Sequence, residues 1–133
     1  MNAFFDAFAQ GTVMRNAEYV PAASIPWNKH QAFAGVFLKN LITQDSTDAM
    51  LSCHLVRIAP NKSIGLHSHA DSIELHEVIA GSGTCIMQSV TLPYTPGTIS
   101  LIACDMPHEV HAGQDGLCLF AKFVSLKPRT DPA

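Results

Sequence analysis

The chain has 133 residues, a length that indicates one domain with a core large enough to fold without disulfides. Hydrophobic residues make up 47% of the chain and charged residues only 14%, so we expect much of the surface to be neutral or covered by another subunit. A net charge of −3 offers no electrostatic basis for binding nucleic acid or an anionic membrane, and no apolar run is long enough to span a bilayer.

The first six residues carry an acid and no base, unlike the start of a signal peptide, and we therefore expect a cytoplasmic protein. The cysteines agree with a reducing compartment. None of them forms a Cys-x-x-Cys pair, and all lie in apolar stretches, where they are interpreted as small buried hydrophobic residues: Cys53, Cys85, Cys104 and Cys118.

Residues 1–30 are expected to form an N-terminal arm. A short helix is predicted over residues 2–11, with Asn2 as its N-cap and Gly11 at its end. One face of this helix is aromatic and carries Phe4, Phe5 and Phe8. Two turns of helix are not stable alone, so this face must pack on the domain or on a second subunit. Together with the low charge content, it predicts a homodimer.

The rest of the chain is typical of short strands separated by turns. Strands are expected at residues 32–43, 49–58, 84–88, 98–103, 108–112 and 117–126, with hairpin turns at 81–83 and 113–116. No amphipathic helix separates them, which argues against a parallel α/β sheet. The pattern predicts an all-β antiparallel sandwich or barrel over residues 31–128, followed by a frayed tail at 129–133.

Histidine and glutamate are concentrated between residues 67 and 76. If this stretch is extended, His67 and His69 point to the same side, and Glu74 can return to that face after a turn. His108 is expected from a neighbouring strand. Three imidazoles and one carboxylate leave open positions on an octahedral ion, and the set suits iron, manganese, nickel, cobalt or zinc. The alternative is that these residues line a wet, metal-free barrel mouth.

The spacing resembles the first motif of the cupin family, G-x5-H-x-H-x(3,4)-E-x6-G. His67, His69, Glu74 and Gly81 fill four of its positions. Asn61, a residue that turns tolerate, replaces the opening glycine.

A second family motif, G-x5-P-x-G-x2-H, is similar to residues 97–108. Gly97 begins it and His108 ends it at the right separation, whereas Ala103 and Asp105 replace the inner proline and glycine. The two motifs place the resemblance over about residues 32–126, and the departures fall on turn positions.

The resemblance implies a jelly-roll barrel, or double-stranded β-helix, with a divalent transition metal held by His67, His69, Glu74 and His108. It implies a metal-dependent enzyme acting on a small organic molecule, of the dioxygenase, isomerase or decarboxylase class. The family also contains non-catalytic members, so a ligand-binding or sensing barrel with a structural metal, or none, stays open. An N-terminal strand that pairs with a partner's sheet is a further family feature, in agreement with the expected homodimer.

Three further histidines, His76, His54 and His111, are interpreted from their strand positions. His76 alternates onto the face of Glu74, and we expect either a catalytic proton donor or acceptor near substrate or a neutral histidine bonded in the core. His54, on the preceding strand, is interpreted as structural. His111 is one register away from His108 and is expected at the surface.

Overall fold

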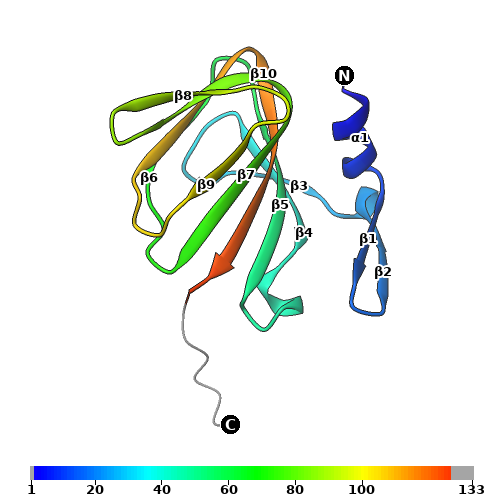
Figure 1. Ribbon diagram of the computed structural model, residues 1–133. Coiled ribbons are helices and arrows are strands. Elements are labelled where there is room, and N and C mark those ends of the chain that lie inside the picture. Colours follow the sequence, from blue (N-terminus) through cyan, green and yellow to red (C-terminus); the bar gives the residue numbers. More distant parts are fainter. Residues whose placement is uncertain (1, 127–133) are drawn as a thin grey trace.

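A computed structural model describes residues 2–126 of the chain (Figure 1). Its elements are α1 (Ala3–Ala9), β1 (Thr12–Arg15), β2 (Glu18–Pro21), β3 (Trp27–Lys29), β4 (Val36–Ile42), β5 (Leu51–Ile58), β6 (Ser63–His67), β7 (Ser72–Met87), β8 (Val90–Tyr94), β9 (Ile99–Ile102) and β10 (His108–Ser125), with short 3-10 helices at Ala22–Ser24 and Gln44–Ser46. The expected tail at 129–133 lies outside the described residues. No helix in the described part is long and apolar enough to cross a membrane.

Two long strands, β7 and β10, form the centre of the barrel. The main sheet has the order β3-β4-β5-β10-β7-β8, and β6 pairs with β10 while β9 pairs with β7. All of these pairings are antiparallel. The all-β jelly-roll architecture with a short N-terminal helix is therefore confirmed (Figure 1).

The hairpin expected at residues 81–83 is wrong, because β7 runs through this segment without turning. The chain turns instead at Gln88 and Ser89, which both adopt a positive φ. The glycines serve close packing of two strands: a Cβ on Gly81 would lie 2.1 Å from the Gly116 carbonyl oxygen. The composition of residues 81–83 favoured a turn, whereas the close contact between β7 and β10 explains why glycine is needed there.

The turn expected at 113–116 is likewise a bulge within one strand. β10 continues from His108 to Ser125, and its register against β7 shifts between Ala112 and Leu117. The bulge bends the strand and lets β10 pair with β5 and with β6 on either side of it. This bend brings His108 opposite His67.

Alternation along β5 separates two hydrophobic cores. Val56 and Ile58 point into the barrel, where they belong to the larger core. Leu55 points outward and packs in a second core with Phe5 of the helix and Leu41 of β4. Burying one such side chain contributes about 1.5–3 kcal/mol, so the second core attaches the arm to the barrel.

The arm is joined to the barrel by backbone and side-chain contacts. Asn2 caps α1 as expected, since its side-chain oxygen accepts from the backbone N–H of Phe4 and Phe5. Trp27–Lys29, which lie in the segment expected to be the arm, form β3 and pair directly with β4. Lys39 of β4 is buried and donates to the carbonyl of Ala22 at 2.7 Å, and burial lowers its pKa.

Candidate metal centre

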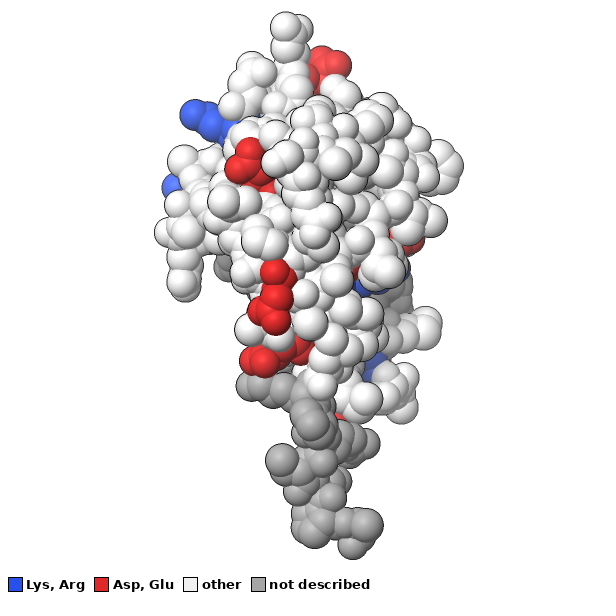
Figure 2. Space-filling view, turned by 60° about the vertical axis from the view of Figure 1, so that its left-hand side comes forward, with Lys and Arg blue, Asp and Glu red and all other residues white. Residues whose placement is uncertain are grey.

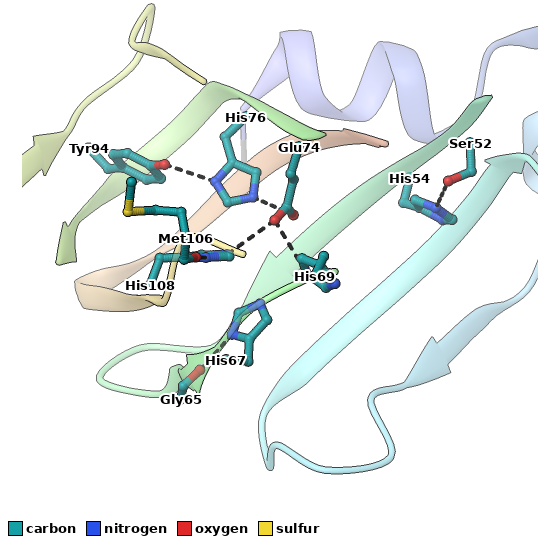
Figure 3. Close-up of polar contacts among 10 residues, drawn as sticks. All are labelled: Ser52, His54, Gly65, His67, His69, Glu74, His76, Tyr94, Met106 and His108. Atoms are coloured by element: carbon teal, nitrogen blue, oxygen red, sulfur yellow. Dashed lines mark hydrogen bonds and ion pairs between the residues drawn. The ribbon is translucent and has the colours of Figure 1, made fainter. Parts of the chain in front are cut away.

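Three elements and one loop bring the predicted ligands together (Figure 3). His67 ends β6, His69 lies in the loop that follows, Glu74 is on β7, and His108 begins β10. Because β10 pairs with both β6 and β7, His108 is held opposite His67 and on the same inner face as Glu74. One potential ligand atom from each of the four residues lies within 4.8 Å of the others.

The Glu74 carboxylate is the centre of the cluster. Its Oε1 lies 3.1 Å from Nε2 of His108 and 3.5 Å from Nε2 of His69. His67 closes the opposite side, with its ring centroid 4.2 Å from that of His108. Glu74 is only 5% exposed, whereas His67 and His69 are partly open to solvent. The cluster therefore has a buried carboxylate end and an accessible imidazole end.

The backbone orients two of the imidazoles. His67 donates its Nδ1–H to the Gly65 carbonyl at 2.7 Å, and His108 donates its Nδ1–H to the Met106 carbonyl at 2.9 Å. Each ring then presents Nε2, which carries a lone pair in the neutral form, towards the cluster. Metal-binding histidines usually donate their other N–H in this way.

The chemistry of this donor set fits a divalent cation. Imidazole lone pairs and a carboxylate oxygen repel one another at about 3 Å unless a proton or a cation lies between them. Three nitrogen donors and one oxygen donor satisfy a transition metal and leave further positions for another ligand. A His/Glu cluster suitable for a metal is thus present, and the structure does not choose the metal.

Burial and hydrogen bonding shift the pKa values in the cluster. Burial alone would raise the pKa of Glu74, but hydrogen bonds from His108, His69 and His76 outweigh it and lower the pKa far below the usual range. Burial lowers the pKa of His67. Burial also opposes protonation of His108, but the contact with Glu74 raises its pKa overall. The pocket therefore keeps an ionised carboxylate beside its imidazoles.

His76 lies behind the carboxylate, on the inward face that alternation predicts. It is 2% exposed, and its Nε2–H donates to Oε2 of Glu74 at 2.7 Å. Its Nδ1 accepts from the hydroxyl of Tyr94 at 2.8 Å. Both ring nitrogens are therefore engaged, and the contacts favour a role in positioning Glu74. Direct proton transfer from His76 to a substrate stays a prediction.

Tyr94 is a site residue that sequence reasoning missed. It belongs to β8, is almost fully buried, and is linked to Glu74 by hydrogen bonds through His76 (Figure 3). Burial raises its pKa, which keeps the hydroxyl protonated as a donor. The only signal in the sequence was a tyrosine in an apolar strand, which does not specify a partner.

Two other titratable residues, Glu77 and His111, face away from the cluster, as alternation along their strands indicates. Glu77 pairs with Lys122 on the outer face, and His111 lies 3.0 Å from Glu109 and 2.7 Å from Ser63. His54 faces the barrel interior but does not contact the four ligands; its partners are Asn40 and Ser52.

Two of the three motif departures preserve the backbone conformation of the glycine that they replace. Asn61 and Asp105 stand where the motifs have glycine, and both have a φ of 61°. Asparagine and aspartate tolerate this left-handed conformation better than other non-glycine residues. The loops that carry His67 and His108 into place are therefore compatible with the substitutions.

An antiparallel barrel with a His/Glu cluster on its inner face defines the class of this protein. A family model described as a cupin domain matches residues 54–121, just over half of the chain, and the chain belongs to the cupin family. A search of curated proteins found no match.

Solved structures share the fold. A predicted oxalate decarboxylase from Thermotoga maritima is 18% identical, with a TM-score of 0.72 over 78% of this chain and 96% of that one. The polyketide cyclase RemF from Streptomyces resistomycificus is 18% identical, with a TM-score of 0.71 over 83% and 80% of the two chains. KdgF from Halomonas sp. is 14% identical, with a TM-score of 0.66 over 77% and 89%. At these identities the likeness shows the fold alone.

Proposed function

We propose that the protein is a metal-dependent enzyme that acts on a small organic molecule, with a divalent transition metal held by His67, His69, Glu74 and His108. The observation that carries the proposal is the convergence of these four donors within 4.8 Å at a partly open face. A bound ion would supply a Lewis acid with coordination positions for an oxygen-bearing ligand.

The residues around the four donors have different roles at such a site. Gly65 and Met106 orient imidazoles through their carbonyls, and His76 holds the inner carboxylate oxygen. The ring centroid of Phe33 lies 6.1 Å from that of His67, and the ring centroid of Phe123 lies 5.0 Å from that of His69. These apolar rings would limit the access of water to the open side of the site. Two fold neighbours are named as a predicted oxalate decarboxylase and a polyketide cyclase, which agrees with a reaction on a small organic molecule. Within this class we propose a decarboxylase, dioxygenase or isomerase acting on a small acid or phenol.

A second candidate is a barrel that binds a small molecule without converting it. The observation in its favour is the position of His76, whose ring is buried and hydrogen-bonded at both nitrogens. Proton transfer would then need a group supplied by the substrate or by water. A metal-loaded protein that binds ligands but neither releases carbon dioxide nor consumes oxygen with any of them would favour this second function.

Elemental analysis of protein purified without chelators tests the proposal. We expect about one transition-metal ion per chain, lost in His67→Ala and Glu74→Gln. His111→Ala is the matched control, because His111 also lies beside a carboxylate but on the outer face. A wild-type protein without metal, or metal retained in both ligand variants, would overturn the site assignment. Oxygen uptake and carbon dioxide release with small 2-oxo acids and phenols then assay activity.

We also propose that the protein is a homodimer. Support comes from α1, whose Phe4 is 74% exposed while Phe5 is buried against the barrel. A groove of about 350 Å³ beside it is lined by Phe4, Phe8, Ile99 and Phe120 among others. Figure 2, in which the side of the molecule away from α1 is turned towards the viewer, shows a mostly uncharged surface with scattered acidic side chains, in agreement with the low charge content of the chain.

A further inference from the structure

A small polar network lies in the barrel interior, across from the candidate metal centre. On adjacent strands, Asn40 pairs with His54, and His54 with Ala121, which in turn pairs with His76. Directly opposed residues share a face of a sheet, so this whole row points inward. In the next row Phe123 separates Ser52 from Glu74. Ser52 and His54 on β5 are two strand spacings from Glu74 and His76 on β7, about 10 Å between Cα atoms, and Asn40 on β4 is one strand further away.

His54 holds this network together. Its Nδ1 lies 2.8 Å from Oδ1 of Asn40, and its Nε2 lies 2.9 Å from Oγ of Ser52. Burial lowers the pKa of His54, which favours the neutral ring with one donor and one acceptor. Both are used in these contacts. The amide of Asn40 and the hydroxyl of Ser52 have more hydrogen-bonding sites than His54 occupies, so they can bind a further group.

Apolar groups lie between the network and the metal centre. The ring of Phe123 packs edge-on against His69 and against His54, at 5.0 and 5.8 Å between centroids. Ala121, with only a methyl group, separates His54 from His76 in the row below. An open and mostly polar pocket of about 590 Å³ reaches Asn40 from the side of β3, and it is lined by Asn28, Lys29, His30, Gln31, Leu38 and Asn40.

We propose that Ser52 and Asn40, held in place by His54, form the second binding point of the substrate pocket. They take a neutral hydroxyl or carbonyl group on a small molecule whose acidic end occupies the metal centre. The chemical class of this molecule follows from the absence of charge on Ser52, Asn40 and His54, and from the apolar groups between the metal centre and the second binding point. This inference rests on the proposed function, because the metal provides the first binding point.

Affinity measurements with three matched 2-oxo acids test the inference. Phenylpyruvate carries a metal-binding head and no distal polar group, whereas 3-hydroxy- and 4-hydroxyphenylpyruvate add one hydroxyl at two positions. We expect at least one hydroxylated probe to bind the metal-loaded protein about fivefold more tightly than phenylpyruvate, the effect of one hydrogen bond. Ser52→Ala and Asn40→Leu should each remove this advantage, measured as the ratio of the two affinities within the same variant, while metal content is retained.

Ser63→Ala is the matched control, because Ser63 makes the same type of contact with His111 on the outside of the barrel. It should retain the advantage. In the wild type, the imidazole ¹⁵N signals of His54 should shift more with the preferred hydroxylated probe than with phenylpyruvate, a measurement that does not depend on variants folding.

Equal binding of all three probes, no binding of any probe, or an advantage that survives both substitutions would overturn this inference while the metal assignment stands. Failure of the wild-type protein to bind metal would overturn the proposed function first, and this inference with it.

Discussion

His76 donates a hydrogen bond to the carboxylate oxygen of Glu74 that faces away from His69 and His108, at 2.7 Å. The other carboxylate oxygen is directed to those two imidazoles. One glutamate thus joins the open cluster to a buried relay that ends at Tyr94.

Replacing His76 should therefore weaken metal binding without removing a ligand. We expect His76→Phe to lower metal affinity about 10- to 100-fold, as loss of an outer hydrogen bond to a ligand commonly does. His76→Gln, which keeps a donor, should lose less. Competition with a fluorescent chelator measures both. Equal affinities in the wild type and His76→Phe would contradict the positioning role.

Metal binding should stabilise the fold, because the ligands come from β6, β7, β10 and the loop after β6. At a free metal concentration of about 100 times the Kd, the free energy of unfolding should rise by about 2.7 kcal/mol. Thermal unfolding with and without chelator measures this. Glu74→Gln should show little response to metal, and a full response in that variant would argue for a different site.

Gly81→Ala should destabilise the barrel strongly. The added Cβ would lie 2.1 Å from a backbone oxygen at a φ of +80°, and we expect a loss of about 3 kcal/mol or more in urea unfolding. Gly97→Ala is the matched control: its φ is +92°, but a Cβ there meets nothing within 4 Å. That change should cost about 1 kcal/mol. Similar losses in the two variants would mean that the contact between β7 and β10 matters little.

The exposed aromatic face of α1 should control association. We expect Phe4→Ser combined with Ile99→Ser to convert the dimer to a monomer in light scattering, because Phe4 and Ile99 line one groove and are 74% and 70% exposed. Val90→Ser, an exposed apolar residue on β8 that does not line this groove, is the control. A wild-type monomer, or a dimer that survives the double substitution, would contradict the proposed interface.

Tyr94 should make the fold sensitive to alkali. Its folded-state pKa is raised by burial, so its contribution to stability is present below the unfolded pKa of about 10 and is lost as pH rises towards the folded value. Tyr94→Phe should therefore lose less stability than the wild type above pH about 10. Urea unfolding between pH 8 and 11 measures the stability of both proteins. Because both contain the same cysteines, the effect of cysteine ionisation cancels when the two pH curves are compared. Parallel pH curves would contradict the assignment.

Local pattern was sufficient to predict much of this protein. Alternating apolar residues and turn residues predicted an antiparallel barrel, and the cupin-like spacing predicted which four side chains meet, although His67 and His108 are 41 positions apart in the sequence. Alternation from Glu74 also placed His76 on the inward face. Each of these predictions depends on spacing within a strand or within a known motif, which the sequence records directly.

Tertiary structure decided the rest. Gly81 and Gly83 suggest a hairpin by composition, but their role arises where β10 approaches β7, and the turn occurs at Gln88 and Ser89 instead. The partners Tyr94 and Asn40 were not predicted, because strand register across the sheet determines which side chains meet. Spacing along the chain therefore predicted from sequence alone which four residues form the His/Glu cluster, whereas pairing between distant strands decided which residues support it.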